Sequence, residues 1–160
     1  MSPTQFPVLS FIILWPILGA IVTSLSSDIK LSKKIALWTA IFELILTLIA
    51  LGLFNSATGN TFQLEEHYAW IPRLNIHYAL GIDGISILFL PMTALLSLSA
   101  IIATWNSVQQ LRCQHFALLL FLEGITIGVF SATDTMLFFF ILGAYFTPPF
   151  LSDWLVGYWS

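Results

Sequence analysis

The sequence predicts an all-α fold, a polytopic bundle of about five transmembrane helices with a short external hairpin-like loop. Of its 160 residues, 58% are hydrophobic and only 8% are charged, whereas a soluble domain carries about 25% charged residues. The mean hydropathy of +0.93 is typical of several bilayer-spanning helices joined by short connections, because each span needs about 20 mostly apolar residues. We therefore interpret residues 1–160 as a single transmembrane domain.

Five apolar stretches of the chain are candidates for membrane spans. They cover about residues 7–25, 35–54, 83–105, 115–131 and 135–151. Pro16, in the middle of the first stretch, predicts a kink there. No Lys or Arg precedes this stretch, which favours a retained helix over a cleaved signal peptide. The twin prolines Pro148 and Pro149 weaken the fifth span.

Basic residues near the span ends predict the orientation of the chain. Lys30, Lys33 and Lys34 follow the first span, and Arg112 lies between the third and the fourth. Such residues stay on the cytoplasmic side of a membrane. We therefore expect an integral protein of the bacterial inner (plasma) membrane with its N-terminus outside, and Arg73 is the single exception to this pattern.

The segment between the second and third spans has the pattern of a β-hairpin. Apolar and polar residues alternate on either side of Pro72 and Arg73, which is the period of strands joined by a turn. A lone hairpin is marginally stable in water, so it should pack on a neighbouring surface. His67 and His77 have no third ligand nearby in the sequence, which favours surface histidines over a metal site.

The composition excludes several classes of function. The five Lys and Arg residues form no extended basic surface, which argues against a nucleic-acid partner. The single cysteine, Cys113, allows neither an internal disulfide nor a thiolate metal cluster. No glycine-rich phosphate loop or catalytic-triad spacing is present. We expect no metal site and no cofactor site in this chain.

Two carboxyl groups lie within the predicted spans and are the candidates for function. An ionisable side chain at the centre of a membrane helix costs about 2.5–3.5 kcal/mol, so it needs a partner or a wet cavity. Glu43 lies in the second span with Thr39 and Thr47 one turn before and after it. This polar stripe should face protein.

Glu123 lies in the fourth span with Thr126 one turn along. Gly124 and Gly128 follow it at the spacing that allows close helix approach, so this face should also be buried. A neutral, hydrogen-bonded glutamic acid is tolerable in a membrane and can exchange protons. We identify Glu123, and with less weight Glu43, as proton-pathway candidates; the alternative is that both are structural.

Polar residues of the third span allow two interpretations. Ser86, Thr93, Ser97 and Thr104 share one face. They form either interhelical hydrogen bonds, which is the commoner role, or a wet path. Asp83 and Asp134, at span ends, are predicted helix-start caps.

Two blocks of sequence resemble a known family. The Trp-Ile-Pro run at residues 70–72 and the Gly-Ile-Asp-Gly-Ile-Ser run at residues 81–86 resemble the antiporter-like proton-pumping subunit of respiratory complex I, subunit M in bacteria and subunit 4 in mitochondria. The run from Leu122 to Phe140 is similar to that family's helices four and five. The resemblance covers about residues 5–142 and corresponds to the N-terminal third of the family.

The resemblance implies a membrane-arm subunit of proton-translocating NADH:quinone oxidoreductase, a translocase that couples electron transport in the respiratory chain to proton transport. It implies as partners the other membrane-arm subunits of complex I and the lipid bilayer. Flavin, iron–sulfur and quinone chemistry would belong to other subunits. No catalytic redox residue is therefore expected in this chain.

The sequence also departs from the family pattern. The family's fifth-helix glutamate falls on Gly143, and its later channel lysines fall beyond Ser160. We therefore expect an incomplete copy that does not move protons by itself. The alternatives are a subunit of a related multisubunit cation/proton antiporter, or a non-transporting fragment with at most a packing or assembly role.

Overall fold

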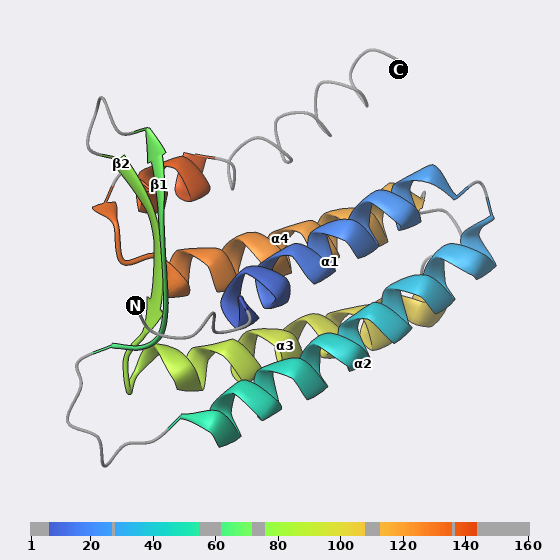
Figure 1. Cartoon of the computed structure of the whole chain (residues 1–160). Coiled ribbons are helices and arrows are strands. Elements are labelled where there is room, and N and C mark those ends of the chain that lie inside the picture. Colours follow the sequence, from blue (N-terminus) through green and yellow to red (C-terminus); the bar gives the residue numbers. More distant parts are fainter. Residues whose placement is uncertain are drawn as a thin grey trace.

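The computed structural model describes residues 7–26, 28–54, 62–71, 76–107, 113–135 and 137–143. Within them, four long helices form a bundle with a β-hairpin across one end (Figure 1). The elements are α1 (Val8–Leu25), α2 (Ile29–Leu53), β1 (Gln63–Ile71), β2 (Ile76–Ile82), α3 (Ser86–Ser107) and α4 (Cys113–Ser131). All four helices are long and apolar enough to cross a membrane, so the predicted fold class is confirmed.

Local capping sets where two helices begin. Helix α2 begins at Ile29 rather than at residue 35, because the Asp28 carboxylate accepts the Lys30 backbone N–H at 2.9 Å. Helix α3 begins at Ser86, whose backbone N–H donates to the Asp83 carboxylate at 2.7 Å. The predicted cap at Asp83 is confirmed. A side-chain acceptor at this position satisfies an amide that has no intrahelical partner.

The predicted fifth span lies mostly outside the described residues. Residues 135 and 137–143 are helical, and the Asp134 carboxylate accepts the Leu137 backbone N–H at 3.4 Å. The helix-start role predicted for Asp134 agrees with this contact.

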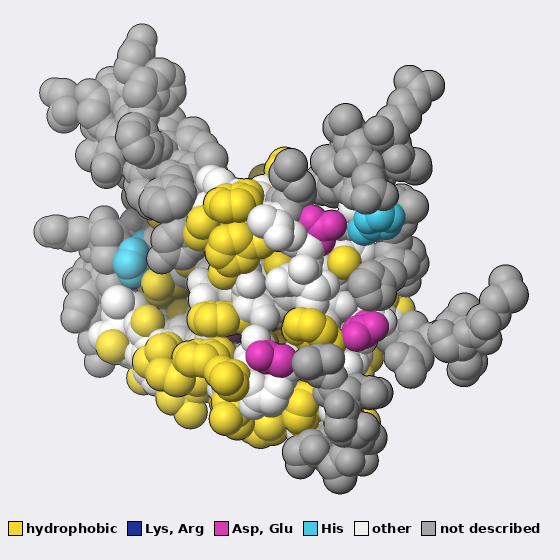
Figure 2. Space-filling model, turned by 90° about the vertical axis from the view of Figure 1, so that its left-hand side faces the viewer, with side chains coloured by type: hydrophobic (Ala, Val, Ile, Leu, Met, Phe, Trp, Pro, Cys, Tyr) yellow, Lys and Arg dark blue, Asp and Glu magenta, His cyan; other side chains and the backbone are white. Residues whose placement is uncertain are grey.

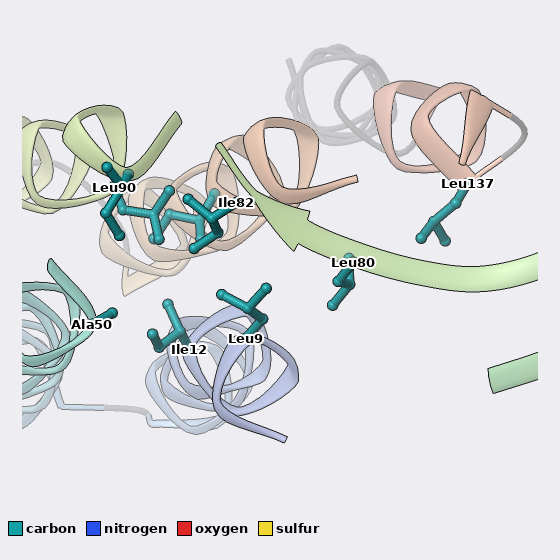
Figure 3. Close-up of a cluster of buried hydrophobic side chains, with 9 residues drawn as sticks. Leu9, Ile12, Ala50, Leu80, Ile82, Leu90 and Leu137 are labelled. Atoms are coloured by element: carbon teal, nitrogen blue, oxygen red, sulfur yellow. The ribbon is translucent and has the colours of Figure 1, made fainter. Parts of the chain in front are cut away.

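The four helices pack as a closed square in the order α1, α4, α3, α2, and α2 also touches α4 across the diagonal. Two clusters of buried apolar side chains fill this interior. The first, at the hairpin end, contains Leu9, Ile12, Ala50, Leu80, Ile82, Ile87, Leu90, Ile127 and Leu137 (Figure 3). The second, at the far end, contains Ala20, Ala36, Ala40, Ile101, Phe116 and Leu120.

The hairpin is antiparallel and is held at the end of the bundle. Its strands pair Tyr68 with Tyr78 and His67 with Ala79. The segment after α4 adds a further contact to β2, because the Thr133 backbone N–H donates to the Ala79 carbonyl at 3.1 Å. The predicted hairpin and its packing on a neighbouring surface are thus present, while Pro72 and Arg73 lie outside the described residues.

Charge is distributed unevenly between the two ends. The hairpin end displays Asp, Glu and His side chains, and no Lys or Arg of the described residues is visible on that face (Figure 2). Lys30, Lys33 and Lys34 lie in the first turns of α2, at the opposite end. Arg112 lies outside the described residues.

Candidate functional site

A polar layer separates the two apolar clusters of the bundle. On α2 it contains Glu43, between Ala40 of one cluster and Ala50 of the other; on α4 it contains Glu123, between Leu120 and Ile127. The relative exposure is 0% for Glu43 and 3% for Glu123. The structure therefore brings both predicted carboxyl groups into the interior at the same level of the bundle.

Glu43 belongs to a buried stripe on α2. Thr39 and Thr47, one turn to either side, are buried with it, as the sequence predicts. The Thr39 hydroxyl donates to the Ile35 carbonyl at 2.8 Å, and the Thr47 hydroxyl donates to the Glu43 carbonyl at 3.1 Å. Because these hydroxyls are used within the helix, the two oxygens of the Glu43 carboxyl have no hydrogen-bond partner in the described part of the chain.

Glu123 has one partner from a neighbouring helix. The Ser97 hydroxyl of α3 donates to Oε2 of Glu123 at 2.8 Å, while Oε1 has no partner among the described residues. Thr126 does not join this contact, since its hydroxyl donates to the Leu122 carbonyl at 2.7 Å.

The other α3 hydroxyls behave differently from Ser97. The Thr93 hydroxyl donates to the Phe89 carbonyl and the Thr104 hydroxyl to the Ala100 carbonyl, each at 2.8 Å within α3. The interhelical interpretation of the polar face is therefore right for Ser97 and wrong for Thr93 and Thr104. A shared face was visible in the sequence, but only the packing of α4 decides which hydroxyl meets a carboxyl.

Gly124 allows the close helix approach predicted for the glycines of α4, and the helix that approaches is α1. A Cβ atom on Gly124 would lie 2.8 Å from Cγ1 of Ile17 and 3.1 Å from the carbonyl oxygen of Ile13. Gly128 is close to the Ile141 side chain, at 3.3 Å on the same measure. This close approach fixes the rotation of α4, so that Glu123 on the adjacent position faces Ser97.

A groove between α3 and α4 reaches the Ser97–Glu123 pair from the side of the bundle. Its volume is about 390 Å³. The Phe89 and Phe130 rings, which also line the groove, stack at a centroid distance of 4.8 Å. Further apolar side chains that line it are Met92, Leu96, Leu119 and Leu122. A polar pair in the lining of a mostly apolar groove can hold a proton away from bulk water.

Few charged groups surround this layer. Helices α1 and α3 contain no Asp, Glu, Lys, Arg or His. On α2 the cations lie in the first turns, where Lys33 donates from Nζ to the Trp105 carbonyl at 2.6 Å. Within the described residues, no group of three His, Cys, Asp or Glu side chains is placed to hold a metal ion.

Comparison with known proteins identifies the relatives of the chain. It is 35% identical over 149 residues to NADH-ubiquinone oxidoreductase chain 4 of Chondrus crispus, covering 92% of this chain and 30% of that protein. It is 32% identical over 159 residues to NAD(P)H-quinone oxidoreductase chain 4 1 of a Synechococcus species, covering 99% of this chain and 29% of that protein. The chain is a homologue of part of subunit M, or chain 4, of NADH-quinone oxidoreductase. NADH-quinone oxidoreductase subunit M of Rickettsia prowazekii agrees, with 24% identity over 160 residues and coverage of 98% and 32%.

The subunit M resemblance of the two sequence blocks is thus confirmed, and the chain spans about 30% of the length of the relatives it matches. The fold is shared with a chain of respiratory complex I from Thermus thermophilus with bound NADH, at a TM-score of 0.73 and 20% identity, covering 89% of this chain and 28% of that chain. The fold is also shared with a chain of the archaeal membrane-bound sulfane sulfur reductase, at a TM-score of 0.70 and 19% sequence identity, covering 90% of this chain and 22% of that chain. A search against family models gave no match.

One buried carboxylate was missed by the sequence analysis. Glu66 of β1 is 8% exposed, and its Oε1 accepts the backbone N–H of Leu9 at 2.7 Å and that of Ser10 at 3.3 Å. The Ser10 hydroxyl also donates to Oε2 and lies 3.0 Å from the Tyr78 hydroxyl. The sequence does show an acidic residue within an alternating strand pattern, which could have indicated a buried carboxylate. Its partners could not be identified, because they are more than 50 residues away in the sequence.

Proposed function

We propose that the chain is a membrane-arm component of a proton-translocating NADH:quinone oxidoreductase, in which Glu123 holds a proton in the membrane interior. The homologues are named as subunits of this oxidoreductase. The observation that carries the proposal is the hydrogen bond from Ser97 to Glu123 at 2.8 Å. Glu123 lies between two apolar clusters, and both residues line the α3–α4 groove.

The chemistry assigned to this chain is proton holding and transfer. A carboxyl group in a membrane interior is tolerable when neutral and hydrogen-bonded, and it can then give up or accept a proton. The chain supplies no residue for electron transfer in this proposal. NADH and quinone chemistry belongs to other subunits, which are its partners together with the lipid bilayer.

The orientation belongs to the same proposal. The end of the bundle with Lys30, Lys33 and Lys34 faces the cytoplasm of a bacterial cell, and the hairpin and the N-terminus lie outside. This assignment is supported by the preference of basic residues for the cytoplasmic side.

A chimera tests the proposal. The segment of a complete bacterial subunit M that matches residues 8–135 of this chain is replaced by those residues, so that the host keeps its own fifth-helix glutamate. NADH oxidation and proton pumping are then measured in inverted membrane vesicles. Glu123→Gln should lower the protons pumped per NADH oxidised, because the amide repeats the hydrogen bond but cannot release a proton. Thr93→Val is the matched control, since Thr93 lines the same groove but bonds only within α3. Unchanged pumping in an assembled Glu123→Gln chimera would refute the proposal.

The second candidate function is a non-transporting packing element. The observation that favours it is Gly143, which stands where the family pattern has a glutamate and which has no titratable side chain. Packing does not require a glycine there, because a Cβ atom at this position would meet nothing within 4 Å. A pump needs a relay of protonatable groups across the bilayer. The purified chain in proteoliposomes should therefore show no proton flux above empty vesicles under an imposed potential. Flux that Glu123→Gln abolishes would show that the chain conducts protons alone.

A further inference from the structure

We propose that Glu43 and Glu123 form a single two-carboxyl proton site in which the two groups share one proton across the α2–α4 diagonal of the bundle. The inference rests on the proposed proton role of Glu123. It adds a second proton-binding group, on a different helix, and a defined charge state for the pair.

The first observation is the isolation of Glu43. Its side chain is fully buried, and neither carboxyl oxygen has a hydrogen-bond partner in the described chain. A buried polar group without a partner costs free energy comparable to a lost hydrogen bond, so each such group calls for an explanation, and a role in chemistry is one of those that occur. An apolar side chain of similar size would fill the same space without that cost.

The second observation is the position of the two carboxyl groups. Helices α2 and α4 touch across the diagonal, and both glutamates lie at the level between the apolar clusters. Two like charges in a low-dielectric interior repel strongly, so the pair does not hold two negative charges at neutral pH.

No cation in the described helices is placed to neutralise the pair. Helices α1 and α3, which flank Glu43, carry no ionisable side chain of the Asp, Glu, Lys, Arg or His type. On α4 the other such group is His115, and on α2 the other such groups are Lys30, Lys33 and Lys34. These lie eight or more residues from the glutamates, which at 1.5 Å per residue is about 12 Å or more along the helix axis. A proton is therefore the cation that can balance the charge.

The site works by moving that proton between the two groups. When it passes from Glu43 to Glu123, one O–H bond breaks on Glu43 and one forms on Glu123, and the pair keeps a net charge of −1. Because the Glu43 oxygens have no hydrogen-bond partner in the described chain, this passage requires the side chains to rotate toward each other. Ser97 donates to Glu123 and so stabilises its ionised form relative to Glu43. Exchange with the exterior proceeds from Glu123, because Glu123 lines the α3–α4 groove.

Infrared titration of the full chain in lipid nanodiscs tests the inference. The protonated carboxyl band is followed across pH for the wild type, Glu43→Gln, Glu123→Gln and the double variant, and the double variant is subtracted to remove the other carboxyl groups. Wild-type protein should lose two protons in steps more than about one pH unit apart, as expected of coupled groups. Each single variant should show one step, and the two single-variant curves should not add up to the wild-type curve.

Additive curves would overturn the inference, because independent groups titrate without regard to each other. Glu66→Gln is the control, since it removes a buried carboxylate outside the layer and should leave both steps in place. If Glu43→Gln fails to fold by circular dichroism, Glu43→Asp keeps the charge but withdraws the carboxyl by one methylene. That variant should bring the two steps closer together, and unchanged steps would equally overturn the inference.

These measurements are independent of the pumping assay. Coupled titration together with unchanged pumping in the Glu123→Gln chimera would leave the shared site intact and refute the proposed function. Additive titration together with impaired pumping would support the proposed function and refute the shared site.

Discussion

The carboxylate of Glu66 in β1 accepts the backbone N–H of Leu9 at the start of α1, with 2.7 Å between Oε1 and the amide nitrogen. Pro7, the residue at the N-cap position of α1, provides no side-chain cap. The first amides of a helix have no intrahelical partner. A strand 57 residues along the chain therefore supplies the acceptor, and the same contact attaches the hairpin to the bundle.

Glu66→Ala should reduce the free energy of unfolding by about 1–2 kcal/mol, the usual cost of losing a helix cap or a charged hydrogen bond. Hydrogen exchange should become faster at the Leu9 and Ser10 amides. Glu66→Gln should have a smaller effect, because its amide oxygen still accepts. His77→Ala, at an exposed position, is the control. Unchanged exchange at Leu9 in Glu66→Ala would show that the contact does not cap α1.

The start of α3 should respond to acid. Hydrogen bonds from Ser86, first from its side chain and then from its backbone, hold the pKa of Asp83 below the usual 3.8. A carboxyl group whose pKa is lower in the folded state stabilises that state while ionised. This contribution is complete above the unfolded pKa of about 3.9 and is lost as the pH falls through the folded pKa.

The expected result is fraying of the first turn of α3 below about pH 4. In an NMR titration, the chemical shift of the Ser86 amide should then move toward its value in an unfolded chain. Asp83→Asn should remove the pH dependence while keeping a cap, because asparagine is an equally good N-cap residue. A Ser86 resonance that titrates identically in Asp83→Asn would assign the effect to another group.

Gly124→Ala should destabilise the bundle by about 1–3 kcal/mol, the range for overpacking a filled interior. The new methyl group would meet the Ile13 carbonyl oxygen at 3.1 Å, and a backbone atom cannot move aside as a side chain can. Unfolding in sodium dodecyl sulfate measures the change. Gly52→Ala is the matched control, because a Cβ atom there meets nothing within 4 Å and the helix gains up to about 1 kcal/mol. Equal effects of the two substitutions would contradict the close α1–α4 approach.

Lys33→Ala should loosen the C-terminal turn of α3. Nζ of Lys33 donates to the Trp105 carbonyl at 2.6 Å and lies 5.9 Å from the centre of the Trp105 ring. A cation at a helix C-terminus contributes about 0.3–1 kcal/mol through the helix dipole. Hydrogen exchange of the last turn of α3 should become faster in Lys33→Ala and remain unchanged in Lys34→Ala, whose side chain is exposed. Equal exchange in both variants would argue that the Lys33 contact is not formed.

The proposed orientation predicts which end of the bundle is reachable from outside the cell. Lys34→Cys and Glu65→Cys, both at exposed positions, are prepared separately in a Cys113→Ser background. A maleimide that does not cross membranes should label Glu65→Cys on intact cells, and should label Lys34→Cys only after the cells are opened. The reverse labelling pattern would invert the orientation.

The sequence was sufficient where the deciding interactions are local. Long apolar runs located the four described helices, and alternation located the hairpin. The cap at Asp83 was predictable because its partner, Ser86, lies within the next turn. The threonine stripe around Glu43 was also predictable, because a spacing of four residues places side chains on one helix face.

The sequence could not predict which helices those faces meet. Thr93 and Ser97 share one face of α3, but only Ser97 reaches Glu123, since the choice depends on the depth and rotation of α4 after Gly124 packs against α1. Glu66 was missed for a similar reason, because its partners Leu9 and Ser10 are 57 and 56 residues away in the sequence.

The sequence by itself therefore determined that this chain is a helical membrane bundle with carboxyl groups in two spans, and that two of its blocks resemble subunit M. Hydrophobic periodicity, capping and motif residues carry that information within one or two turns. Only the tertiary structure decided that Glu43 and Glu123 share one polar layer between two apolar clusters, that Ser97 bonds to one of them, and that Glu66 caps α1. These relationships depend on contacts between distant segments, which form when whole helix faces are buried together.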